Sequence, residues 1–179
     1  VHARAYIEAK LAERDKRHEK WVDSRFVLEP HVKDGKGGLR DLQTLTWLAR
    51  YCYGVAQAAD LVRTDLLTDD ERAHTREAYV FFATVRAHLH ALRNRAEERL
   101  TFDAQTEIAA RLGFTGDTRQ QQAEKFMQQY FAYTRHVGAL TRIFCAQLEE
   151  ENLRAQARPL MVQEALRRDL PQYLALENG

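Results

Sequence analysis

The sequence contains few of the residues that interrupt helices or form crosslinks. Three prolines and eight glycines occur in 179 residues, so long helices can run with few breaks. Cysteine is equally scarce, with Cys52 and Cys145 both lying in apolar helical patterns. This usage predicts buried free thiols in a reducing compartment and argues against a disulfide-stabilised scaffold.

Long apolar runs and an excess of one charge are also absent. No apolar stretch approaches the roughly 20 residues of a membrane-spanning helix, and no secretory signal is visible. The 27 basic and 26 acidic side chains leave a net charge of +1, so any anion binding has to be local. We expect a cytoplasmic protein with no nucleic-acid or membrane partner. Because the chain begins at Val1, we also expect it to be a piece of a longer protein.

Most of the chain has apolar residues at helical spacing, and no segment alternates like a strand. The prediction is an all-α fold, a bundle of long amphipathic helices. Thr68 and Glu71 form a capping box, Asp103 is a candidate cap, and Gly54 and Gly113 are candidate helix stops. The predicted helices cover about 2–22, 42–53, 55–63, 69–96, 100–112 and 118–152, with a short extended piece at 21–28 and a last helix between Pro159 and Pro171.

Several polar groups on these helices have simple structural explanations. The acids at 69–71 stabilise a helix N-terminus, and we predict no metal site there. His88 and His90 are two apart on a helix and face different directions. Arg86, His90 and Arg93 share one face, which is either part of an anion pocket or a solvated surface.

The stretch from Glu29 to Leu42, which reads EPHVKDGKGGLRDL, differs in composition from the helices. Three of the eight glycines fall within four positions, beside two lysines and before an arginine. Packing does not explain this composition. Glycines leave backbone N–H groups uncovered, and the helix that follows adds its dipole, so the stretch predicts an anion site. A tight turn whose lysines face solvent is the alternative. We expect Asp41 to cap the helix or orient Arg40.

The candidate residues for phosphate or nucleotide binding are Lys33, Gly35, Lys36, Gly37, Gly38 and Arg40, with Arg86 and His90 as second-tier candidates.

The same stretch resembles EPNVKEGKGGLRDL, the signature of the bifunctional PII uridylyltransferase/uridylyl-removing enzymes, which are bacterial nitrogen sensors. His31 stands where that family has asparagine. The resemblance extends over roughly residues 1–152. Its further landmarks are WLARYCYG at 47–54, LTDDE at 67–71, VRAHLH at 85–90, RLTFDAQ at 99–105, residues 109–114 and EKFMQQY at 124–130.

The resemblance implies a helical domain that follows a nucleotidyltransferase core. That core has a G-S-x-x-R turn and a D-x-D carboxylate pair holding two Mg²⁺ ions on the triphosphate, and neither motif occurs here. The family's HD and ACT domains are also absent, so we expect no catalytic residue in this chain. The implied organisation is a linking helix at 1–28, the Gly/Lys-rich loop at 29–41, the helical bundle domain at 42–152 and a helical extension at 153–179.

The implied function is to help the missing core bind UTP and transfer UMP to the PII protein in nitrogen-assimilation control. Mg²⁺ and UTP then belong to the parent enzyme, with PII, the core and the HD domain as partners. One alternative is a helical interaction module that docks PII or the HD domain. Another is the equivalent region of the glutamine synthetase adenylyltransferase, which has a similar GG-L/I-R-D element. Domains linked to cystathionine-synthase-type pairs remain a third.

Overall fold

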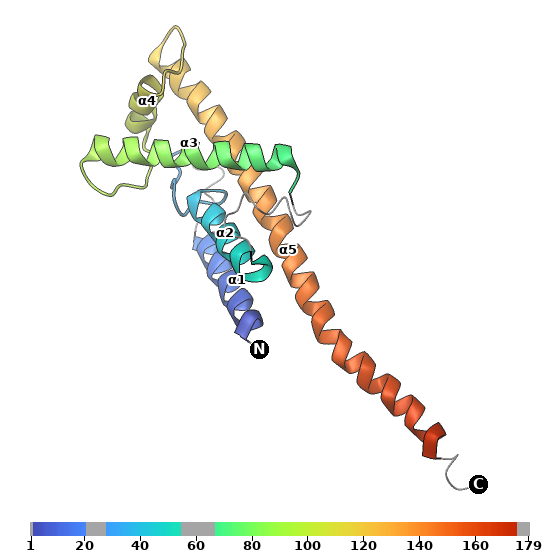
Figure 1. Cartoon of the computed structure of the whole chain (residues 1–179). Coiled ribbons are helices and arrows are strands. Elements are labelled where there is room, and N and C mark those ends of the chain that lie inside the picture. Colours follow the sequence, from blue (N-terminus) through green and yellow to red (C-terminus); the bar gives the residue numbers. More distant parts are fainter. Residues whose placement is uncertain (1, 21–27, 55–66, 175–179) are drawn as a thin grey trace. The chain divides into compact units, whose positions relative to one another are not determined.

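The structure is a computed structural model that describes residues 2–20, 28–54 and 67–174, with side chains described over 5–20, 28–54 and 67–150. The predicted all-α fold is confirmed, and the described residues contain no strand beyond one isolated bridge between His31 and Arg99. No helix in these ranges is long and apolar enough to span a membrane. The predicted helix at 55–63 and nearly all of the extended piece at 21–28 lie outside the described residues. The helices are α1 (His2–Lys20), α2 (Leu39–Tyr53), α3 (Asp69–Arg93), α4 (Phe102–Arg111) and α5 (Arg119–Leu174) (Figure 1).

The ends of α2 and α3 follow the capping chemistry that the sequence predicts. The Thr68 hydroxyl accepts the Glu71 N–H at 3.2 Å, and the Glu71 carboxylate accepts the Thr68 N–H at 2.8 Å, which completes the capping box. Gly54 takes the left-handed conformation, with φ 65°, and its N–H donates to the Arg50 carbonyl at the end of α2. Helix α3 ends at Arg93, earlier than predicted, because Asn94 is left-handed with φ 48°.

Helix α4 is shorter than predicted, and Asp103 is not its cap. Thr101 is the N-cap residue, and its hydroxyl donates to the Asp103 carboxylate at 2.6 Å. Asp103 also accepts from the Arg93 guanidinium at 2.6 Å. The Asp103 carboxylate is therefore engaged mainly by side chains, and the Phe102 N–H at the start of α4 donates instead to the Glu29 carboxylate at 3.0 Å. Gly113 follows the helix with φ 77°, as expected of a stop.

Helix α5 does not end near Asn152 as predicted. It continues through Pro159 and Pro171 to Leu174, so the separate last helix is wrong. A proline removes one backbone hydrogen bond and crowds the preceding turn, but the turns on either side keep their own bonds. The chain divides within α5 into two compact units, Val1–Phe144 and Cys145–Gly179, and the described part of the second unit is the remainder of this helix.

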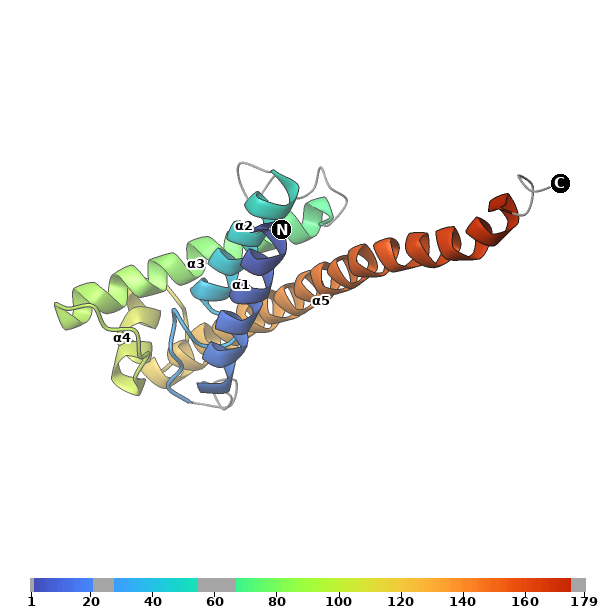
Figure 2. The same ribbon diagram turned by 90° about the horizontal axis from the view of Figure 1, so that it is seen from below.

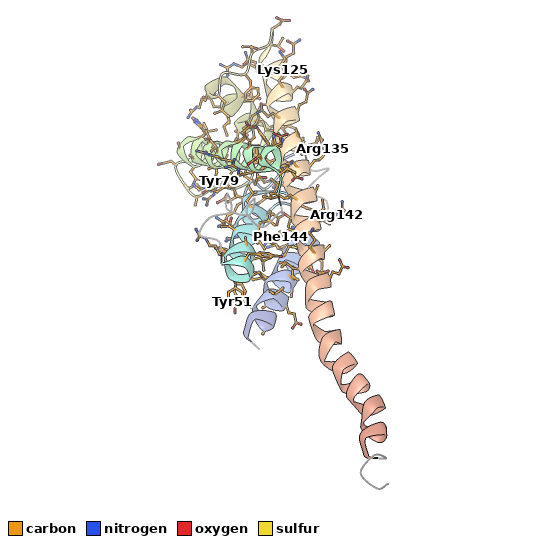
Figure 3. The ribbon with its side chains drawn as sticks, turned by 45° about the vertical axis from the view of Figure 1, so that its right-hand side comes forward. Tyr51, Tyr79, Lys125, Arg135, Arg142 and Phe144 are labelled. Carbon is orange, nitrogen blue, oxygen red and sulfur yellow. The ribbon has the colours of Figure 1, made fainter. Side chains whose placement is uncertain are left out.

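In the first unit, α1 and α2 run side by side in opposite directions (Figures 1 and 2). Leu11 on α1 and Leu48 on α2 are buried there. The Phe144 ring lies 6.1 Å from the Tyr53 ring on α2, whereas Arg135 and Arg142 point away from the core into solvent (Figure 3). The apolar stripe of α5 therefore faces the bundle, as its spacing predicts.

Helix α3 packs on the first half of α5 through aromatic side chains. Phe82 and Tyr130 are fully buried, with ring centroids 5.4 Å apart in an edge-to-face arrangement. Phe81 lies 5.0 Å from Tyr133 and 5.9 Å from Phe126. Burial also raises the pKa of the Tyr130 hydroxyl, since the phenolate loses its hydration. These contacts hold the part of α5 against which the glycine-rich loop lies.

Candidate functional site

The first half of the loop pairs with the segment that precedes α4. The Val32 N–H donates to the Glu98 carbonyl at 2.8 Å, and the Leu100 N–H donates to the Pro30 carbonyl at 2.9 Å. These bonds flank the antiparallel bridge between His31 and Arg99. The loop is therefore joined to residues nearly seventy positions later in the chain, and Val32 is fully buried at this junction.

The second half of the loop folds on its own backbone. Four of its N–H groups donate to loop carbonyls, and the bonds are Gly35 to His31 at 2.9 Å, Gly38 to Gly35 at 2.9 Å, Leu39 to Val32 at 3.2 Å and Arg40 to Lys33 at 2.8 Å. The N–H of Gly37 donates to the Asp41 carboxylate at 2.8 Å. The expectation that the glycine N–H groups are uncovered for an anion is wrong, because all three already have acceptors inside the protein.

Packing does explain the three glycines. A Cβ built on Gly35 would lie 2.6 Å from the His31 carbonyl oxygen, and one on Gly38 would lie 2.7 Å from that of Val32. Gly37 has φ 78°, and its Cβ would lie 2.0 Å from the carbonyl oxygen of Thr134 on α5. Each glycine stands where backbone approaches backbone, so the loop needs them for its shape.

The buried carboxylate of Asp41 lies beneath this turn. It is fully inaccessible to solvent and receives the Arg17 guanidinium at 2.5 Å, the His18 imidazole at 2.9 Å and 3.0 Å, and the Gly37 N–H. Burial alone would raise the pKa of Asp41, but the hydrogen bond and charge of His18, the Gly37 amide and Arg17 together lower it. The prediction that Asp41 caps α2 or orients Arg40 is wrong, because its oxygens face α1 and the Gly37 N–H of the loop.

Sequence reasoning missed Arg17 and His18. The available signal is their position on α1, since His18 follows buried Leu11 by seven residues and therefore lies on the same helix face. A polar side chain on a buried face needs a buried partner. Finding that partner requires the tertiary structure, because Asp41 is 23 residues further along the chain than His18.

The cationic side chains of the loop lie at its surface. Lys33, Lys36 and Arg40 are each partly exposed. The Arg40 guanidinium lies 3.4 Å from the Asp34 carboxylate and donates to the Gln43 side chain at 3.0 Å. These predicted residues therefore lie on one turn with each side chain partly exposed, and the guanidinium of Arg40 also lies over the Trp47 ring.

Arg86 and His90 of α3 meet at Glu98, the residue whose carbonyl receives the loop. Arg86 donates to both Glu98 oxygens at distances of 2.5 to 2.9 Å, and this raises the pKa of Arg86. The Nε2 atom of His90 lies 3.4 Å from Glu98 and is buried without a hydrogen bond.

Burial lowers the pKa of neighbouring His31, while Asp34 and Glu98 act in the opposite direction. The structure thus brings Arg86 and His90 beside the loop, whereas Arg93 pairs with Asp103 instead.

A Mg²⁺ site does not fit the described part of the chain. No three His, Cys, Asp or Glu side chains in residues 5–20, 28–54 and 67–150 are grouped as metal ligands.

Neither cysteine forms a disulfide. Cys145 is buried, and Cys52 is only partly buried.

Comparison with known protein families assigns the chain to one of them. The model of the family described as GlnD PII-uridylyltransferase matches residues 5–145. The chain belongs to this PII-uridylyltransferase family. The matched range nearly coincides with the first compact unit, Val1–Phe144, and contains the whole loop with every candidate residue. The resemblance that the loop signature indicated is confirmed.

Similar proteins are named bifunctional uridylyltransferase/uridylyl-removing enzymes. The one from Rhodospirillum rubrum is 53% identical over 156 residues, which is 87% of this chain and 16% of that protein. The one from Azospirillum brasilense is 52% identical over 149 residues, covering 83% of this chain and 16% of its own length. A third, from Erythrobacter litoralis, is 47% identical. The chain thus spans about a sixth of the length of these relatives. No solved structure matches the chain.

Proposed function

We propose that this chain is the helical part of a PII uridylyltransferase, and that it helps the nucleotidyltransferase core bind UTP and transfer UMP to the PII protein. The single observation that carries this proposal is the loop at 29–41, which presents three cationic side chains on a turn held by buried contacts. The family match across the whole loop supports it. The reaction then takes place in the cytoplasm and contributes to nitrogen-assimilation control.

The chemistry of UMP transfer requires positive charge beside the triphosphate. In the proposed transfer, a nucleophilic oxygen of PII bonds to the α-phosphorus of UTP, the bond from that phosphorus to the bridging oxygen breaks, and negative charge increases on the departing pyrophosphate. In the proposal, Lys33, Lys36 and Arg40 lie on the pyrophosphate side and stabilise that charge through their side chains. Because the glycine amides are engaged, Gly35, Gly37 and Gly38 contribute the shape of the turn and no direct N–H contact.

Arg86 and His90 have a secondary role in this proposal. The Arg86 guanidinium is committed to Glu98, so its role is to position that carboxylate beside the loop. His90 has an unsatisfied buried nitrogen next to the same carboxylate. We place both residues at the edge of the nucleotide site.

Catalysis is assigned to the rest of the parent enzyme. This chain has neither the G-S-x-x-R turn nor the D-x-D pair, and it spans only 16% of its Rhodospirillum rubrum relative. The Mg²⁺ ligands, the site of attack by PII and the uridylyl-removing HD domain then belong to other segments. By itself, the chain is proposed to be inactive.

The test is substitution of Lys36 and Arg40 by alanine in the full-length enzyme. The rate of UMP transfer should fall about tenfold to a hundredfold for each, because a charge that stabilises the leaving group is lost. Arg50→Ala is the matched control, since Arg50 is exposed and lies on the same helix as Arg40. The uridylyl-removing rate of the same preparation reports correct folding. Unchanged UMP transfer in both variants would refute the proposal.

A second candidate is a docking role for the exposed face of α3. Tyr79 and Val80 are 51% and 54% exposed, and Tyr79 projects from α3 (Figure 3). Contiguous exposed apolar patches mark interaction surfaces, and this second proposal places both side chains in such a patch. A pull-down of PII or the HD domain with wild type and Val80→Ser, run beside a UTP titration, separates docking from nucleotide binding. The relatives are named uridylyltransferases, which favours the uridylyltransferase function over the adenylyltransferase alternative.

A further inference from the structure

Helix α1 contacts the glycine-rich loop through one buried carboxylate. Asp41 Oδ1 receives Arg17 at 2.5 Å, His18 Nε2 lies 3.0 Å and 2.9 Å from the two oxygens, and Oδ2 accepts the Gly37 N–H at 2.8 Å. Asp41 is fully buried, and the side chains of Arg17 and His18 are only 10% and 18% exposed. Two side chains of α1 and the backbone of the loop thus share one acceptor.

Gly37 has little freedom to move independently of this carboxylate. On its other side its backbone lies against the Thr134 carbonyl of α5, at a spacing that excludes any side chain. Its φ of 78° requires a specific orientation of the N–H that Asp41 accepts. Lys36 precedes Gly37 directly, so the orientation of the Gly37 peptide sets the direction in which the Lys36 side chain leaves the turn.

The stability that the buried Arg17–Asp41 pair adds does not by itself explain its presence. Burying a guanidinium and a carboxylate together removes both from water, and well-packed apolar side chains of the same size often serve equally well. The Nε atom of Arg17 is moreover buried without a hydrogen bond. The pair also links α1 to the loop, because Arg17 and the Gly37 N–H contact the same carboxylate.

We infer that Arg17 and His18 are positioning residues that set the conformation of the loop through Asp41 and Gly37, and thereby the placement of Lys36. This inference rests on the proposed function for its effect on UMP transfer, but the structural link to the loop stands without it. Neither residue touches the reacting atoms in this assignment. Their position on α1 makes the orientation of that helix a determinant of the loop conformation.

The experiment compares Arg17→Gln, Arg17→Lys and His18→Gln in the full-length enzyme. Hydrogen exchange of the peptide covering 33–41 is measured without nucleotide, and KM is measured separately for UTP and for PII. In Arg17→Gln, loop exchange should accelerate and kcat/KM for UTP should fall, each about tenfold, while KM for PII stays unchanged. Arg17→Lys should restore most of both, since it returns a positive charge to Asp41. His18→Gln, which keeps a hydrogen-bond donor, should have the smaller effect.

Arg14→Gln is the matched control, because Arg14 is similarly buried on α1 but pairs with Asp15 of the same helix. Unchanged loop exchange in Arg17→Gln would overturn the inference. Hydrogen exchange that accelerates equally in α1 to α5 of Arg17→Gln would also overturn it, because this would indicate a merely structural role. Faster loop exchange in Arg17→Gln, together with unchanged UMP transfer in both Lys36→Ala and Arg40→Ala, would overturn the proposed function and leave the positioning of the loop by Arg17 supported.

Discussion

The backbone of Gly37 lies so close to Thr134 that a Cβ built on the glycine would be 2.0 Å from the threonine carbonyl oxygen. The two residues come from the loop and from the first third of α5, and their contact places the loop against that helix. Gly138, one turn later, also leaves room there, since its own Cβ would lie 3.9 Å from the Gly37 Cα. The place of the loop therefore depends on small residues on both sides of this contact.

Gly37→Ala should destabilise the first compact unit substantially. The substitution puts a Cβ into the Thr134 backbone and also strains a left-handed residue, so we expect a loss of about 2–5 kcal/mol in the free energy of unfolding. Chemical denaturation monitored by circular dichroism measures this loss. Gly54→Ala is the control, because Gly54 has φ 65° but no atom within 4 Å of its Cβ position. It should cost only about 1 kcal/mol. Equal losses in both variants would contradict the close approach.

Trp47 should report nucleotide binding at Arg40. The Trp47 ring lies 5.9 Å from the Arg40 guanidinium carbon and 4.8 Å from the Lys10 ammonium. When a phosphate draws Arg40 away from the ring, the indole environment changes. We expect UTP to alter the emission of the full-length enzyme by an amount that Trp47→Phe removes. Arg40→Ala should abolish the response, whereas Arg50→Ala should keep it. A fluorescence response that persists in Arg40→Ala would show that Trp47 does not report nucleotide binding at Arg40.

The stability of the α3–α5 contact should decrease in mild acid. The His136 imidazole lies 3.1 Å from the Thr75 hydroxyl, and its ring centroid is 4.4 Å from that of His74. Burial and the neighbouring His74 lower the pKa of His136, against a smaller opposite effect of Glu71. Because the folded-state pKa lies below the unfolded value near 6.5, His136 contributes stability above that pH. This contribution is lost as the pH falls through the folded-state pKa.

The measurement is the change in melting temperature between about pH 7.5 and about pH 5.5. His136→Gln keeps a polar partner for Thr75 and removes the titration, so its decrease should be smaller than that of wild type. His88→Gln provides a control histidine on α3 outside this cluster. A wild-type decrease that His136→Gln leaves intact would assign the acid sensitivity to other groups.

The capping box at the start of α3 should be worth about 1 kcal/mol of stability. Thr68→Ala removes the hydroxyl that accepts the Glu71 N–H and leaves that donor to water. Thr68→Ser preserves the hydroxyl and should unfold at nearly the wild-type denaturant midpoint. Urea titration of the three proteins measures the difference, and a Thr68→Ser variant as unstable as Thr68→Ala would assign the effect to the lost methyl group.

Helices could be predicted from the sequence because their signals are local. Thr68 and Glu71 are three residues apart, and Gly54 directly follows the helix that it ends, so no distant contact is needed to recognise these boundaries. The continuity of α5 through Pro159 was not predictable in this way. A proline weakens a helix without always ending it, and the outcome depends on the turns around it.

Local patterns were enough to predict the helical class, the family through the loop signature, and the cationic residues within one short stretch. The reason for the three glycines and the role of Asp41 could be found only from the folded arrangement. Both answers lie in contacts between residues far apart in the chain, Gly37 with Thr134 and Asp41 with Arg17 and His18. In a sequence, a glycine that is needed for close backbone approach looks the same as a glycine that binds an anion. Physically they differ in whether the N–H has an acceptor within the protein, and here it has one.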